Sequence, residues 1–201
     1  MHSENQNNTP DYKGAGEFIL GKLKNELPGK LLYHRLEHTL DVLDAAIKIA
    51  AAEKIPEEEK KLLRMAVLFH DSGYMYVYKN HEDEGCRIVK KCLPGFGFTR
   101  EQINKICAII MATKDPKHPK SKLDKIIVDA DLDYLGRDDV YEIAQKLFDE
   151  LKIYGRISTT KEWDNFQVNF LKNQHYHTNY SKKNREPKKQ QYLNELLKKI
   201  Q

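Results

Sequence analysis

The chain has 201 residues, of which 40% are hydrophobic and 32% are charged; this balance is typical of one soluble globular domain and excludes a disordered or fibrous chain. Its apolar runs, such as residues 65–69, are far shorter than the roughly 20 residues of a transmembrane helix, so no membrane attachment is expected. The net charge of +4 suits a small anionic substrate but gives no reason to expect a nucleic acid polymer as partner.

The cysteines and the first residues indicate the cellular compartment. The three cysteines are odd in number and form no C-x-x-C pair, so neither a disulfide framework nor a cysteine-built zinc site is expected. The N-terminal segment has neither the basic region nor the apolar region of a secretory signal. We therefore expect a cytoplasmic protein with a flexible leader at residues 1–15 and a single domain at residues 16–201.

Helical periodicity runs through nearly all of the chain after this leader, with apolar residues recurring at spacings of three and four. In chain order, the predicted helices cover residues 36–50, 56–69, 81–92, 99–110, 123–130, 140–151, 163–170 and 192–200. Thr99 and Gln102 have the spacing of a capping box at the start of one of these helices. No segment alternates with the period of two that is typical of strands. The sequence therefore predicts an all-α fold that ends in a short basic helix.

Residue types that bind metals lie at the ends of several predicted helices. His34 and His38 are four residues apart and so share one face of a helix. His70 and Asp71 are adjacent at the end of a strongly apolar helix, and His81 follows ten residues later. Each of these signals has an ordinary alternative, since such side chains also occur on solvated surfaces or as helix caps. Their combination indicates a metal site.

Three carboxylates complete this pattern. Asp129, Asp131 and Asp133 follow an apolar helical run, where a carboxylate is costly to bury unless it is paired, hydrogen-bonded or bound to a metal. Together with the histidines they form a mixed nitrogen and oxygen donor set, which suits a divalent Mn, Fe, Zn, Ni or Mg ion.

The order of these residues resembles that of the HD superfamily of metal-dependent phosphohydrolases. His38, then His70 with Asp71, then Asp131 follow the order of the superfamily's motifs, and the resemblance extends over residues 33–151.

Three stretches strengthen this resemblance. Residues 33–42 look like the opening motif of cyclic-nucleotide phosphodiesterases, and residues 66–73 look like the second motif of the superfamily. Residues 129–139 look like a stretch found in a bacterial subgroup of predicted HD phosphohydrolases. The resemblance implies a single-domain HD-type helical bundle.

The resemblance also implies a ligand set. His38, His70, Asp71 and Asp131 would hold a first divalent metal ion, and Asp71 could bridge to a second one. Asp131 is preferred over Asp129 because of its Ala-Asp-Leu context. Asp129 would then lie behind the site and orient a ligand imidazole.

Asp133 would point elsewhere on the same helix, because residues two apart diverge by about 200°. Asp129 and Asp133 keep the alternative of being surface carboxylates.

Catalytic roles follow from the same resemblance. His34 matches the general acid of the cyclic-nucleotide phosphodiesterases, and an imidazole can protonate a leaving oxygen near neutral pH; the alternative is a histidine that merely starts a helix. Lys114 stands near the position where two-metal members tend to place a further histidine, and it would orient a substrate phosphate unless it is simply a surface lysine. His81 could serve a second metal ion or the phosphate.

The function implied is metal-dependent hydrolysis of a phosphate ester, on a nucleotide or a related small molecule, with no cofactor besides the metal. Three alternatives remain: a cyclic-nucleotide phosphodiesterase, a di-iron oxygenase of the same fold, and a nucleotide-binding sensor without catalysis. Tyr74, Tyr76 and Tyr78 could stack on a base or could pack their own loop. The sequence indicates no oligomeric state.

Overall fold

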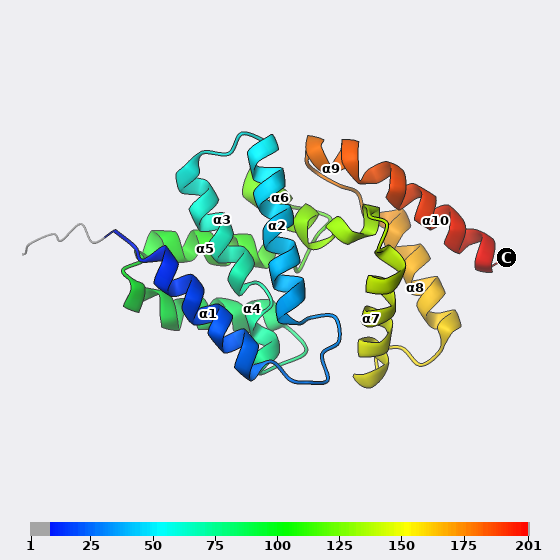
Figure 1. The fold of residues 1–201 in the computed structure, drawn as a ribbon, viewed down its shortest axis with the longest axis horizontal. Coiled ribbons are helices and arrows are strands. Elements are labelled where there is room, and N and C mark those ends of the chain that lie inside the picture. The colour runs from blue at the N-terminus through cyan, green and yellow to red at the C-terminus, as the bar shows by residue number, and fades with distance from the viewer. Residues whose placement is uncertain (1–8, 201) are drawn as a thin grey trace, which may run out of the picture.

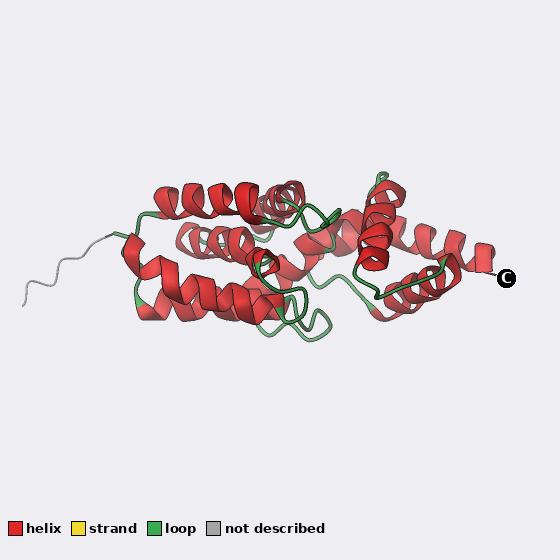
Figure 2. Cartoon of the chain, turned by 90° about the horizontal axis from the view of Figure 1, so that it is seen from below, coloured by secondary structure: helices red, strands yellow, loops and turns green. Residues whose placement is uncertain are grey.

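The computed structural model describes residues 9–200, and within this range it contains helices and loops but no strands (Figure 2). The α-helices are α1 (Tyr12–Glu26), α2 (Leu36–Ala52), α3 (Glu57–Phe69), α4 (His81–Cys92), α5 (Arg100–Ala112), α6 (Lys122–Asp131), α7 (Val140–Ile153), α8 (Thr160–Asn173), α9 (Asn179–Asn184) and α10 (Glu186–Ile200). Three short 3-10 helices join them: η1 (Ser72–Met75), η2 (Leu93–Phe96) and η3 (Asp133–Gly136). The all-α prediction is confirmed. No helix of the described part is long and apolar enough to cross a membrane.

The helices form two groups, which Figure 1 shows next to each other. In the first group, α1 to α6 surround one core, in which Phe69, Ile106 and Ile110 are fully buried. In the second group, α7, α8 and α10 pack around smaller clusters that include Leu171 and Trp163. Because each group has its own core, the surface between them is available to form a cleft.

Helix α3 carries the site residues into the interior. Its residues 65–69 are all buried, and the helix contacts α1, α2, α5 and α6. A helical stretch that is apolar on every side must be covered by neighbours on every side. His70 and Asp71, which follow Phe69, therefore lie in the centre of the first group.

Side-chain caps fix where the neighbouring helices begin. Thr99 and Gln102 form the predicted capping box at the start of α5. Ser121 and Thr159 cap α6 and α8 in the same way. Such caps satisfy backbone N–H groups that the first turn of a helix leaves free. The Ser121 cap fixes the register of α6, whose last turn carries Asp129 and Asp131.

The N-terminal boundary differs from the sequence prediction. Helix α1 begins at Tyr12, inside the segment that was assigned to a flexible leader, and the Asp11 side chain caps it by accepting a hydrogen bond from the Gly14 N–H. The start of the helix is tied to the core because the Asp11 backbone N–H donates to the carbonyl oxygen of Phe96. Residues 1–8 of the predicted leader lie outside the described residues.

Gly73 allows η1 to touch the start of α4. A Cβ atom on Gly73 would lie 2.0 Å from the carbonyl oxygen of His81, a distance that no real contact permits. The absence of a side chain at this position thus sets the place of His81 relative to the end of α3.

We expect Gly73→Ala to lower the free energy of unfolding by about 1–3 kcal/mol, because the new methyl group forces η1 away from α4. Chemical denaturation measures this change. Gly21→Ala is the matched control: Gly21 lies within α1 with no atom within 4 Å of the added methyl group, and alanine there should stabilise by up to about 1 kcal/mol. Equal stability of Gly73→Ala and the wild type would contradict the close contact.

Candidate metal centre

Three helix ends bring the motif residues together. His38 lies in the first turn of α2, His70 and Asp71 directly follow α3, and Asp131 is the last residue of α6. Helix α2 packs against both α3 and α6, so these ends meet in the middle of the first group. His38, His70 and Asp71 are buried, whereas the side chain of Asp131 is 25% exposed and borders a cavity.

The four donor atoms are close neighbours. His38 Nε2 lies 3.0 Å from Asp131 Oδ1 and 3.5 Å from Asp71 Oδ2. His70 Nε2 lies 3.3 Å from Asp71 Oδ2 and 3.7 Å from Asp131 Oδ1. Ligand atoms that surround an ion at about 2.0–2.2 Å are themselves about 3.0–3.5 Å apart. The observed spacing therefore fits a divalent ion.

Two of these atoms have no partner of their own. His70 Nε2 and Asp71 Oδ2 are buried and make no hydrogen bond within the described part of the chain. Leaving such groups unsatisfied costs about 1–3 kcal/mol each. His70 Nδ1 is bonded to the carbonyl oxygen of Val67 at 2.6 Å, and this contact aims Nε2 at the cluster. The residues present fit a metal ion of the kind predicted.

The charge state of the carboxylates also suits a cation. Burial raises the pKa of Asp71, but the neighbouring imidazoles, His70 first, outweigh it and hold that pKa below its usual range. Burial acts in the same direction on Asp131, but its hydrogen bond to His38 and the nearby imidazole of His70 outweigh it and hold that pKa low as well. Both carboxylates are therefore ionised at neutral pH.

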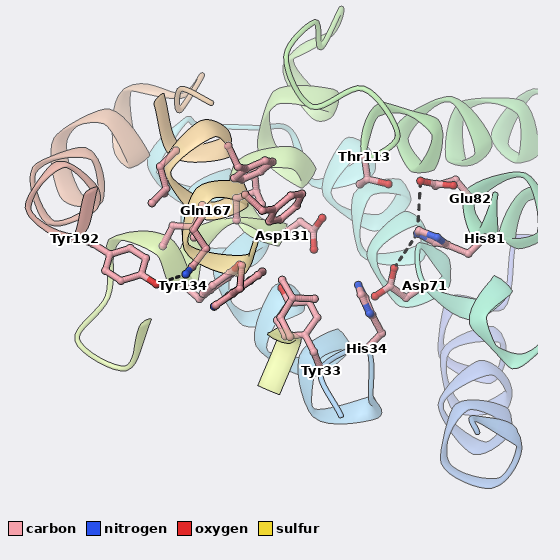
Figure 3. A pocket seen from close by; sticks show the side chains of 17 residues that line it. Tyr33, His34, Asp71, His81, Glu82, Thr113, Asp131, Tyr134, Gln167 and Tyr192 are labelled. Atoms are coloured by element: carbon pink, nitrogen blue, oxygen red, sulfur yellow. Dashed lines mark hydrogen bonds and ion pairs between the residues drawn. The ribbon is translucent and has the colours of Figure 1, made fainter. Parts of the chain in front are cut away.

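His81, the predicted ligand of a second metal ion or phosphate, lies beside this cluster. Its Nε2 is 3.5 Å from Asp71 Oδ1 and 3.6 Å from Glu82 Oε1 (Figure 3). The two oxygens of Asp71 thus face different imidazoles, one in the cluster of four and one at the start of α4. Glu82 is buried and was given no role by the sequence analysis.

His34 is held by a residue that the sequence analysis missed. Its Nδ1 lies 2.5 Å from Glu150 Oε1, and Glu150 on α7 is completely buried. The other oxygen of Glu150 accepts hydrogen bonds from the backbone N–H groups of Leu32, Tyr33 and His34. One carboxylate therefore fixes both the loop and the imidazole.

This contact also sets the charge of His34. Burial lowers the pKa of His34, but the hydrogen bond to Glu150 and the nearby Asp71 outweigh it, so that the pKa is raised above its ordinary value. The His34 Nε2 atom is on the side of the cavity, 3.3 Å from the hydroxyl of Tyr74. An imidazole that carries a proton toward a cavity is suited to donate it.

The three tyrosines of the following loop have different roles. Tyr74 is buried and stacks on His34 and His81, with ring centres 4.3 and 4.0 Å apart. Tyr78 stacks on Tyr154 and donates a hydrogen bond to Glu150. Tyr76 is exposed and is bonded to α1. Tyr74 and Tyr78 therefore brace the histidines.

Two cavities meet at these residues. A cavity of about 180 Å³ lies between the two helix groups, lined on one side by His34, Asp71 and Asp131 and on the other by aromatic residues of α8 (Figure 3). A second cavity of about 680 Å³ adjoins it, since His34 and His81 border both. A ligand can therefore reach the cluster from the cleft.

Lys114 lies on the rim of the second cavity. Its ammonium group donates to Asp83 at 2.5 Å and to Asn80 at 3.3 Å, and its side chain is 40% exposed. Lys79 and Arg156 line the same cavity and form no ion pair within residues 9–200. Lys114 is therefore one of three cations around this cavity, and it lies outside the ring of metal-type ligands.

The expected role of Asp129 is wrong. Its carboxylate accepts hydrogen bonds from the backbone N–H groups of His177 and Thr178 and from the Thr178 hydroxyl, at 2.6–3.1 Å. Among residues 9–200, Asp129 forms no hydrogen bond to a histidine ring. Asp129 points away from the ligand imidazoles because it lies two residues before Asp131 on a regular helix, and it anchors the segment that leads into α9 instead.

Asp133 points away from the cluster, as the sequence analysis expected, but it is not a surface carboxylate. It is buried and pairs with Arg185 at 2.8 Å and Arg137 at 3.7 Å. These contacts join η3 to the segment before α10.

Substitution of Asp131 and of Asp133 should separate metal binding from stability. We expect Asp131→Asn to lower metal affinity by more than about 10-fold, because one charged donor is lost. Asp133→Asn should keep the metal and lower the free energy of unfolding by about 1–3 kcal/mol, because the pair with Arg185 is broken. Metal titration and chemical denaturation measure the two effects, and the reverse result would show that Asp133 is the ligand.

Comparison with known proteins gives one match. The family model described as HD domain matches residues 35–133, a range that contains His38, His70, Asp71 and Asp131. No curated protein and no solved structure matches the chain. Helices α7 to α10 lie outside the matched range.

Proposed function

We propose that the protein hydrolyses phosphate esters with a divalent metal ion. The premise is that residues 35–133 of this chain belong to the HD domain family. That family consists largely of metal-dependent phosphohydrolases. One observation carries the proposal: four metal-type ligand atoms lie close together, two of them are buried and without a partner, and Asp71 and Asp131 border a cavity.

The ligands of the metal ion would be His38, His70, Asp71 and Asp131. A divalent ion there would supply Lewis-acid chemistry, since it lowers the pKa of a coordinated water and offsets the charge of the phosphoryl group. Asp71 Oδ1, His81 and Glu82 support a position for a second ion next to the first. Metal analysis of the purified protein gives the number of ions per chain.

His34 would protonate the leaving group. In the reaction, the oxygen of water forms a bond to phosphorus while the bond from phosphorus to the ester oxygen breaks. The leaving oxygen takes a proton from His34 Nε2, and the proton that water loses restores the imidazole, so no further reactant is consumed. Glu150 keeps the proton on His34 until this step, because its carboxylate favours the charged form.

The cations of the second cavity would bind negatively charged groups of the substrate. Lys79, Lys114 and Arg156 surround a space that borders both His34 and His81. When a phosphate group of the substrate lies at the metal ligands, further negative charge of the substrate can therefore be balanced by these cations. This supports a small anionic substrate, with Lys114 in the orienting role that the sequence analysis gave it.

A reconstitution experiment tests the proposal. The protein is stripped with a chelator and is then supplied with Mn²⁺, Mg²⁺, Fe²⁺, Zn²⁺ or Ni²⁺. Each form is assayed with p-nitrophenyl phosphate, bis(p-nitrophenyl) phosphate, nucleoside monophosphates and a cyclic nucleotide. We expect hydrolysis that requires the added metal, and the diester and cyclic arms identify the kind of ester. Absence of hydrolysis with every metal, or hydrolysis by the stripped protein, would contradict it.

A further inference from the structure

The cavity between the two helix groups has an aromatic wall that the proposed chemistry does not use. Trp163, Phe166 and Phe170 follow one another along α8 and line this cavity. Neighbouring rings are nearly parallel, with interplanar angles of 19° and 15° and centres 5.7 and 6.3 Å apart. These residues lie outside the range that matches the HD domain. The wall therefore lies in a part of the chain that the family model does not cover.

One ring of this wall is exposed. Phe166 is 48% exposed although its neighbour Trp163 is buried, and Phe166 borders both cavities. Exposing a large aromatic side chain at the mouth of an inner cavity gives up the burial that would stabilise it. A planar group stacked on Phe166 would restore that burial.

Hydrogen-bonding groups stand among the apolar ones. Gln167 is buried on α8 and accepts a hydrogen bond from the hydroxyl of Tyr192 on α10. This bond fixes the amide of Gln167, a residue that lines the cavity and whose NH₂ group makes no hydrogen bond within the described residues. A heterocycle presents acceptors at its edge, whereas an alkyl chain presents none, so these groups favour a heterocycle.

We propose that the α8 wall binds a planar heterocyclic ring of the substrate, so that the substrate class is nucleoside phosphates. The ring lies against Phe166 with its edge toward Gln167, while the phosphoryl group lies toward Asp71 and Asp131 at the other side of the same cavity. The position of the phosphoryl group rests on the proposed function. The binding of the ring rests on α8 alone.

The chain contains a natural reporter for this site. Trp163 is its only tryptophan, and it packs against Phe166 on one side and Phe148 on the other. Fluorescence excited where tryptophan but not the 11 tyrosines absorbs therefore reports on the α8 wall. The protein with bound metal is titrated with adenosine 5′-monophosphate, uridine 5′-monophosphate and ribose 5-phosphate, and the emission of Trp163 is recorded.

We expect both nucleotides to change the emission of Trp163 at saturation and ribose 5-phosphate to leave it unchanged. Phe166→Leu should weaken the binding of both nucleotides by about 10-fold, which lies within the range for loss of one base stacking contact. Phe18→Leu is the matched control, because Phe18 is a partly exposed phenylalanine on α1, far along the chain from the cavity, and it should leave nucleotide affinity unchanged. Thermal denaturation shows whether both variants remain folded.

Equal responses to ribose 5-phosphate and to the nucleotides would overturn the inference, as would nucleotide binding that Phe166→Leu leaves unchanged. Titration of the protein stripped of metal with a chelator, using adenosine, separates this inference from the proposed function. Adenosine has no phosphate, so a change in Trp163 emission there supports the ring site even when no ester is hydrolysed. Hydrolysis of ribose 5-phosphate as efficiently as of the nucleotides would instead support the metal chemistry and overturn the ring site.

Discussion

Asp71→Asn should remove bound metal and hydrolytic activity together. Asp71 Oδ2 lies between the ring nitrogens of His38 and His70, and its other oxygen faces His81, so no other residue contacts as many of the metal-type ligands. Asparagine keeps the shape of the side chain but loses its charge. Outer partners of metal ligands already change metal affinity by about 10- to 100-fold, and we expect this substitution to exceed that range.

Metal content after dialysis and turnover with a saturating ester measure the two losses. Asp44→Asn, on the exposed side of α2, is the matched control and should change neither. An Asp71→Asn protein that keeps its full metal content and full turnover would refute the assignment of the metal centre.

His34→Asn should leave metal content near normal and lower kcat by about 10²–10⁴-fold, the range expected for loss of a general acid. The loss should be smaller with p-nitrophenyl phosphate, because a good leaving group departs with little protonation. An ester with a poor alkoxide leaving group should show the full loss. Equal losses on both substrates would mean that His34 positions the phosphate instead.

The pH dependence gives a second measure of this role. A general acid must carry its proton, so the activity of the wild type should fall as the pH rises through the pKa of His34. Because the hydrogen bond to Glu150 raises that pKa against the effect of burial, the decline should be centred at a higher pH than for an ordinary histidine. In His34→Asn this basic limb should be absent. A basic limb that persists unchanged would assign it to another group.

The fold class and the four ligand-type residues could be predicted because their signals are local. Periods of three and four reveal helices, and the adjacent pair His70–Asp71 interrupts a strongly apolar helix where only a bound or exposed polar group is tolerated. The structure brings this pair together with His38 and Asp131, as the order of the motifs suggested. Such residues are visible in the sequence because each motif is contiguous.

Glu150 was missed because its partner His34 lies 116 residues earlier in the chain. One signal was nevertheless present: Glu150 follows Leu147 by three residues on the apolar face of α7, and a carboxylate there needs a partner. Asp129 shows the opposite error. Its neighbours in sequence suggested a contact with a ligand imidazole, but its hydrogen bonds go to a loop about 48 residues later, which no local pattern reveals.

For the aromatic wall of α8, the sequence predicts only a helix over residues 163–170. Trp163, Phe166 and Phe170 have the spacing of one helix face, and periodicity does not distinguish a face that packs against a neighbour from one that lines a cavity. The difference depends on how far the two helix groups lie apart. Such an arrangement involves segments that are distant in the sequence, and no local pattern reveals it.

The most direct test of the central claim is the anomalous difference density of crystals of the protein grown with Mn²⁺. We expect the strongest peak within about 2.0–2.3 Å of His38 Nε2, His70 Nε2 and one carboxylate oxygen each of Asp71 and Asp131. Crystals of Asp71→Asn grown in the same way should lack this peak. A strongest peak elsewhere in the molecule, or the same peak in Asp71→Asn crystals, would contradict the metal centre on which the proposed hydrolysis depends.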